Sequence, residues 1–116
     1  MIRDLAKDGF KFVTIIDPGV KIEDGYHIYE EGMRQGYFAR TPEGEVYENA
    51  VWPGEAVFPD FGASKTRGWW ADNQKYLVDL GARGVWNDMN EPAIFFTPEG
   101  VKDVKEAMKA FIDKEE

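Results

Sequence analysis

A nearly continuous apolar run, FKFVTIIDP over residues 10–18, limits the folds that are open to this chain. The run is rich in β-branched residues and does not alternate with polar ones. This is the pattern of a strand covered on both faces, as in a parallel sheet. Proline cannot donate a hydrogen bond to a strand ladder, so the strand is expected to end at Asp17-Pro18.

A second, shorter strand is expected in RGVWNDMN, residues 83–90, directly after an amphipathic helix. Ser64 is a candidate N-cap of this helix, and Gly81 is expected to end it. The helix is expected to carry its large apolar residues on one face: Trp69, Trp70, Tyr76, Leu77 and Leu80. A strand, a helix and a strand in this order form a βαβ crossover, whose strands are parallel. The sequence therefore predicts an α/β fold.

Two further helices are expected near the ends of the chain. Residues 2–8 form a short helical pattern that Gly9 would stop. Thr97 and Pro98 offer an N-cap and a first helical residue for the other helix. Its apolar residues recur at helical spacing: Val101, Val104, Met108, Phe111 and Ile112.

The segment between the first strand and the central helix, residues 21–60, differs from the rest of the chain in composition. Aromatic residues stand there among glycines and acids, and YFARTPEGEVYE, residues 37–48, is typical of a β-hairpin that turns at residues 41–44. We expect an insertion of loops and a hairpin without a long helix. Such long excursions inside a domain are often functional.

Charge and composition exclude several kinds of partner. The chain has 22 acidic and 14 basic residues, and a net charge of −8 argues against a nucleic-acid partner. It has no cysteine and a single histidine, which argues against a disulfide or a transition-metal site. Neither a dinucleotide-binding nor a phosphate-loop motif is present. We therefore expect no cofactor and no metal. Without a membrane-spanning or signal-like apolar stretch, no membrane partner and a cytoplasmic location are expected.

Both predicted strands end at an aspartate. Asp17 and Asp88 would lie at the carboxyl ends of parallel strands, where α/β sheets and barrels place their sites, so a shared pocket is expected. A polar turn after a strand explains each aspartate equally well. The spacing of Glu91 from Asp88 is common by chance. Trp86 is a candidate wall of the pocket. Trp52 can also be interpreted as an aromatic residue of the core.

The stretch GVWNDMNEP, residues 84–92, resembles the nucleophile signature of glycoside hydrolase family 31, the α-glucosidase family, whose pattern runs W-x-D-M-N-E-P. VTIIDPGV, residues 13–20, resembles the family's strand with an Asp-Pro end. VWPGEAVFPDF, residues 51–61, resembles its W-P-G…F-P-D-F segment, and WWADN fits the helix before the nucleophile strand. The resemblance covers residues 5–96 in the expected order.

This resemblance implies a role for each candidate residue. Asp88 would be the catalytic nucleophile of a retaining α-glucosidase and would form the glycosyl-enzyme intermediate. Asp17 would bind hydroxyl groups of an α-glucoside or oligosaccharide substrate. Trp52 and Trp86 would form apolar walls of the same subsite, and Glu91 would be a supporting carboxylate near the nucleophile. A retaining glycosidase also needs a second, protonated carboxyl group on the other face of the sugar.

The resemblance further implies a TIM (β/α)₈ barrel, which takes about 250 residues. We therefore expect residues 1–116 to be a single truncated, partial barrel of about two parallel strands with flanking helices, with residues 21–60 inserted at its mouth. The acid/base would lie on a later strand, so the isolated fragment is expected to be inactive. Open strand edges and apolar faces would favour its self-association.

Two alternatives remain open. In the first, the chain is a non-catalytic carbohydrate-binding α/β module whose tryptophan-rich loops bind sugars. In the second, it is a structural α/β domain whose acidic residues are only solvated. Maltose binding that persists in Asp88→Ala and is lost in Trp52→Ala would favour the binding module.

Overall fold

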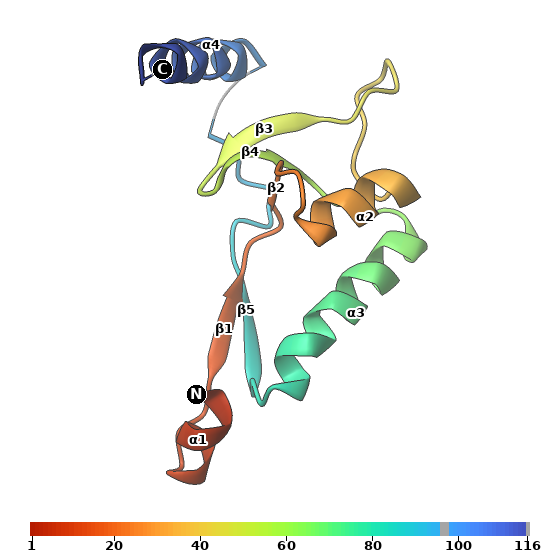
Figure 1. The fold of residues 1–116 in the computed structure, drawn as a ribbon. Coiled ribbons are helices and arrows are strands. Elements are labelled where there is room, and N and C mark those ends of the chain that lie inside the picture. Colours follow the sequence, from red (N-terminus) through yellow and green to blue (C-terminus); the bar gives the residue numbers. More distant parts are fainter. Residues whose placement is uncertain (96–97, 116) are drawn as a thin grey trace.

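The computed structural model describes the chain except residues 96, 97 and 116, and two small sheets organise it (Figure 1). One sheet pairs β1 with β5, and the other has the order β2-β4-β3. The strands are β1 (Val13–Ile16), β2 (Val20–Lys21), β3 (Glu48–Val51), β4 (Gly54–Val57) and β5 (Gly84–Asn87). The helices are α1 (Ile2–Lys7), α2 (His27–Gln35), α3 (Ser64–Asp79) and α4 (Pro98–Glu115).

The β1–β5 sheet confirms the predicted crossover. The two strands are parallel, with Ile15 opposite Trp86 and Ile16 opposite Asn87. The helix α3 precedes β5 along the chain and runs beside the pair (Figure 1). The predicted strand, helix and strand are therefore all present.

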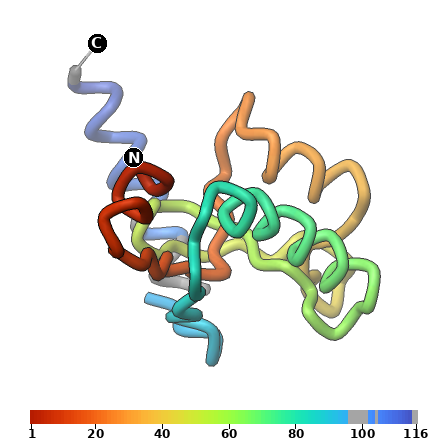
Figure 2. Tube along the Cα trace, turned by 90° about the horizontal axis from the view of Figure 1, so that it is seen from below, coloured from red at the N-terminus to blue at the C-terminus, as the bar shows by residue number. Residues whose placement is uncertain are grey.

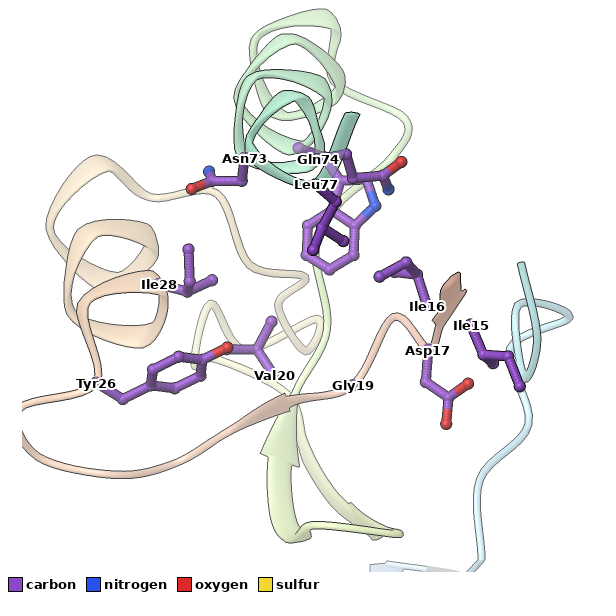
Figure 3. A pocket seen from close by; sticks show the side chains of 11 residues that line it. Ile15, Ile16, Asp17, Gly19, Val20, Tyr26, Ile28, Asn73, Gln74 and Leu77 are labelled. Carbon is purple, nitrogen blue, oxygen red and sulfur yellow. The ribbon is translucent and has the colours of Figure 1, made fainter. Parts of the chain in front are cut away.

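Only one face of this sheet is covered within the described part of the chain. Ile16 points toward α3 (Figure 3), whereas Val13 and Ile15 on the opposite face are 60% and 56% exposed. The prediction that this strand is covered on both faces is thus wrong, because α3 packs against one side and each strand has one neighbour. The exposed apolar face that we expected of a partial barrel is confirmed.

The core lies around the β2–β4–β3 sheet and the two helices beside it. Its buried centre consists of Val20, Phe38, Val57 and Trp69. Partly buried side chains surround this centre: Ile22, Tyr26, Ile28, Tyr29, Tyr37, Val46 and Trp70. The helices α2 and α3 lie side by side here, whereas α4 lies apart from them, at the end of the molecule that carries β3 (Figure 1 and Figure 2). Residues 21–60 thus supply much of the core.

The insertion contains one short helix, α2, of nine residues, which the sequence did not indicate and which leaves the expectation of no long helix in place. A Cβ atom on the buried Gly32 would lie only 2.3 Å from the Phe38 ring, so α2 packs directly on that ring. The predicted turn at residues 41–44 is confirmed. The Thr41 N–H donates to the Glu45 carbonyl at 2.7 Å, and Arg40 pairs with Val46.

Details at the helix ends differ from expectation. The helix α3 begins at Ser64 itself, and its N-cap is Ala63, without a side-chain hydrogen bond, so Ser64 as N-cap is wrong. Tyr76 is 68% exposed because its part of α3 faces solvent, not the core.

The short first helix and its stop are confirmed by α1 and the left-handed Gly9. Thr97 lies outside the described residues, as do the side chains of Val101 and Val104.

No helix in the described part of the chain is long and apolar enough to cross a membrane. The same residues contain no cluster of three or more histidine, aspartate or glutamate side chains that is arranged to hold a metal ion.

Candidate active site

The two candidate aspartates lie at the same edge of the β1–β5 sheet. Asp17 follows β1 and Asp88 follows β5, and the last residues of these strands pair with each other. The Asp88 N–H donates to the Ile16 carbonyl at 3.1 Å, so the ladder continues into the Asp88 loop. The predicted juxtaposition at the carboxyl edge is therefore present.

Trp86 lies on the sheet face turned away from α3, opposite Ile15, and is 56% exposed. Asp88 follows two residues later, in the loop directly after β5. Asp88 is itself exposed. This face thus carries an aromatic side chain two residues before an exposed carboxylate.

The Asp17 carboxylate points away from the helices (Figure 3), and the residue is half-buried. Its Oδ1 atom is buried and accepts no hydrogen bond from the described residues. A buried carboxylate oxygen is costly unless a donor reaches it. Because Oδ1 is closed to solvent, a ligand hydroxyl group is expected to approach the Asp17 carboxylate at Oδ2.

Local backbone geometry orients Asp88. Its Oδ1 accepts a hydrogen bond from the N–H of Met89 at 3.0 Å. Met89 has a φ of 57°, a left-handed conformation that is uncommon for a non-glycine residue. The Met89 carbonyl in turn accepts the N–H of Ala93 at 3.1 Å. The sequence motif alone did not indicate this turn.

Trp52 lies in the turn between β3 and β4 and is 73% exposed, so its alternative reading as a core aromatic is wrong. Its ring meets that of Phe95 edge to face, with centroids 5.0 Å apart. The apolar AIFF that follows the signature was the signal for this partner. The two rings form an exposed aromatic surface contributed by separate segments.

Glu91 is exposed, and it forms no hydrogen bond or ion pair with the described residues. The structure thus brings Asp17 and Asp88 to one edge but gives Glu91 no contact with either. The supporting role of Glu91 stays a prediction.

Two hollows flank the carboxyl edge. A cavity of about 240 Å³ on the helix side of β1 is lined by Ile16, Trp70, Asn73 and Leu77, among others (Figure 3). A second, of about 430 Å³, includes Phe61, Gln74, Asn87 and Asn90 in its lining. Asp88 lines neither hollow and is open to solvent, so the expected pocket is not enclosed by the described residues.

The family model of the glycosyl hydrolases family 31 TIM-barrel domain matches residues 1–114. The chain belongs to glycosyl hydrolase family 31. The curated α-glucosidase 2 of Bacillus thermoamyloliquefaciens is 50% identical over 95 residues, which are 82% of this chain and 12% of that protein.

Solved structures agree with this membership. A Glc1Man2-bound glucosidase II α subunit matches 85% of the chain with a TM-score of 0.73 and 33% identity, and the match covers 11% of that subunit. The family 31 α-glucosidase of Bacteroides thetaiotaomicron matches 80% of the chain with a TM-score of 0.72 and 40% identity, over 16% of its own length. The chain therefore spans a small part of each of these relatives.

Membership of family 31 explains the uneven burial of the β1–β5 sheet. In a TIM barrel the helices lie outside and the strands' other face points into the barrel. The chain has the parallel strands and flanking helices of part of such a barrel, as predicted. The exposed Val13, Ile15 and Trp86 are then interior residues, and the edge with Asp17 and Asp88 is at the mouth.

Proposed function

We propose that this chain is part of a retaining α-glucosidase in which Asp88 is the nucleophile. The observation that carries the proposal is the shared carboxyl edge of Asp17 and Asp88 in a family 31 barrel segment. The similar protein of Bacillus thermoamyloliquefaciens is named an α-glucosidase, and this supports an α-glucoside as the substrate.

The chemistry follows from the placement of the carboxylates. An ionised carboxylate attacks the anomeric carbon while a protonated carboxyl group on the other face protonates the departing oxygen. A water molecule then hydrolyses the glycosyl-enzyme intermediate. Asp88, exposed at the barrel mouth and oriented by Met89, takes the first role in this proposal.

The other candidate residues would hold the sugar. Asp17, which is half-buried, accepts hydroxyl donors at the carboxylate oxygen that is not closed to solvent. Trp86 and Trp52 supply aromatic surfaces for the apolar faces of the ring. Glu91 supports the loop of the nucleophile.

The nucleophile assignment can be tested by trapping with an α-glucosyl fluoride, whose fluoride leaves without protonation. We expect a glucosyl adduct on the peptide with Asp88, detected by mass spectrometry, absent in Asp88→Asn and retained in Glu91→Gln. An adduct on Glu91, or none although sugar binding is observed, contradicts the assignment.

We also propose that the 116-residue chain alone does not turn over substrate, because one carboxylate cannot supply both roles. The measurement is hydrolysis of an activated aryl α-glucoside by the pure chain. Turnover that disappears in Asp88→Ala would contradict the proposed inactivity while supporting the nucleophile.

The exposed Trp52–Phe95 pair favours sugar binding without chemistry as a second candidate function. Titration with maltose separates the two. Binding that is unchanged in Asp17→Ala and Asp88→Ala but lost in Trp52→Ala would favour the binding module.

A further inference from the structure

A buried apolar cluster in the β3–β4 hairpin lies against both aspartate loops. We call Val51, Ala56 and Phe58 the hairpin cluster; all three are at least nine-tenths buried. Its members belong to the second sheet and to the segment just after it, not to the strands that carry the aspartates. Contacts from two sides connect this cluster to the carboxyl edge.

The first contact is made by Gly19, two residues after Asp17, where the chain passes from β1 into β2 (Figure 3). A Cβ atom at Gly19 would lie 2.6 Å from Val51 Cγ2 and 3.6 Å from the Ala56 Cβ. Glycine is therefore needed here for close approach of the backbone and not for a left-handed φ. The Asp17 turn lies directly on the hairpin cluster.

The second contact is made by Met89, the residue after Asp88. Its side chain is partly buried and packs against the hairpin cluster together with Tyr47. Its N–H donates to the Asp88 carboxylate, and its φ is left-handed. A left-handed conformation of a non-glycine residue persists only where its surroundings stabilise it. The packing of the Met89 side chain against the hairpin cluster supplies such stabilisation.

We propose that the hairpin cluster is the common support that sets the position of Asp17 relative to Asp88, with Gly19 and Met89 as positioning residues. The inference rests on the proposed function in that it treats the two carboxylates as partners on one sugar. Catalytic groups must be held within about 0.5 Å of their productive geometry, and close-packed interiors transmit small displacements.

The same hairpin presents Trp52 in its turn, directly after Val51. A shift of the hairpin therefore moves the exposed tryptophan together with the support of both aspartates. In this proposal the segment between β1 and β5 determines the relative positions of three candidate sugar contacts, which are Asp17, Asp88 and Trp52.

The test is a double-mutant cycle between Gly19 and Val51, read by NMR on the isotope-labelled 116-residue chain. The signals are the side-chain carboxyl carbons of Asp17 and Asp88 and the amide of Met89. We expect Gly19→Ala to shift the Asp88 and Met89 signals, although residue 19 is in a different segment. Val51→Ala in that background should restore more than half of the shift, because it removes the methyl group that the new Cβ meets.

Gly68→Ala is the matched control, because a Cβ there has no atom within 4 Å and the φ is not left-handed. It should leave the three signals in place. A Gly19→Ala shift confined to the neighbours of residue 19, or one that Val51→Ala does not reduce, overturns the proposal.

Met89 supplies an independent arm if Gly19→Ala does not fold. Met89→Leu keeps the side-chain volume and should leave the Asp17 carboxyl signal unchanged, whereas Met89→Ala should shift the signals of both aspartates. An Asp17 signal that is unaffected by Met89→Ala contradicts a shared support. These signals report geometry without sugar or turnover, so failure of the glucosidase proposal would be recognised separately in the trapping experiment.

Discussion

The two sheets of this chain bury their β-branched apolar residues very differently. Val20 and Val57 of the β2–β4–β3 sheet are 3% and 1% exposed, whereas Val13 and Ile15 of the β1–β5 sheet are 60% and 56% exposed. The β2–β4–β3 sheet is packed against α2 and α3 by aromatic side chains. The β1–β5 sheet carries both candidate aspartates at its edge, and the described residues cover only one of its faces. Burial is therefore concentrated around the β2–β4–β3 sheet, whereas the candidate carboxylates lie at the edge of the β1–β5 sheet.

The sharpest way to test this division is to remove one large side chain from each sheet region. Phe38→Ala should lower the free energy of unfolding by about 3–5 kcal/mol, because the ring is buried against Trp69 and Tyr29. Trp86→Ala should cost far less, because the indole is largely exposed. Urea unfolding measures both. Similar losses in the two variants would mean that the sheets are equally important for stability.

Close packing in the core predicts a smaller effect for an added methyl group. Gly32→Ala places a Cβ against the Phe38 ring and should cost about 1–3 kcal/mol by overpacking. Gly68→Ala, on open helix surface, should be neutral or stabilising by up to about 1 kcal/mol because alanine favours helices. The urea midpoint should therefore fall in Gly32→Ala and stay unchanged or rise in Gly68→Ala. Stabilisation by Gly32→Ala would contradict the packing of α2 on Phe38.

The residues that were predictable from sequence are those governed by local rules. The alternation-free VTII predicted β1, Pro18 its end, and Thr41 to Gly44 the turn. Parallel pairing followed from the order of elements.

What sequence reasoning missed depends on tertiary contacts. The helix α2 is short and has a glycine, Gly32, in its middle, and it is held by tertiary packing, with the Phe38 ring against that glycine and Ile28 and Tyr29 against the core. The exposure of Tyr76 depends on which side of α3 has neighbours. The signature predicted Asp88, yet it did not indicate that the next residue, Met89, is left-handed and packs against residues of the β2–β4–β3 sheet region.

The open face of β1 and β5 predicts association between copies of the chain, with little effect on unfolding. Ile15→Lys places a charge in the middle of that face and should shift sedimentation toward the monomer. Because Ile15 is already exposed, the urea midpoint should change little. Lys11→Ala, at an exposed position before β1, is the control. A chain that sediments as a monomer at high concentration, with or without the substitution, would contradict the prediction.

The smallest effect is expected where Lys105 of α4 forms exposed ion pairs with the hairpin. Lys105 Nζ lies 2.6 Å from Glu48 Oε2 and 3.5 Å from Glu55 Oε1, and all three side chains are substantially exposed. Exposed ion pairs contribute less than about 1 kcal/mol, so Lys105→Ala should lower stability by less than that amount. Lys102→Ala, an exposed lysine on the same helix, is the matched control.

The pH dependence of this contact has a definite sign. The hydrogen bond with Glu48 raises the pKa of the Lys105 ammonium group above its ordinary value of 10.5, and burial opposes the rise only in part. A raised folded-state pKa means that the contribution is fully present below the ordinary value and is lost as pH rises through the folded value. The difference in stability between the native chain and Lys105→Ala should therefore be constant near neutral pH and shrink above about pH 10. A difference that instead stays constant through that range would show that Lys105 contributes through its aliphatic stem and not through its ammonium group.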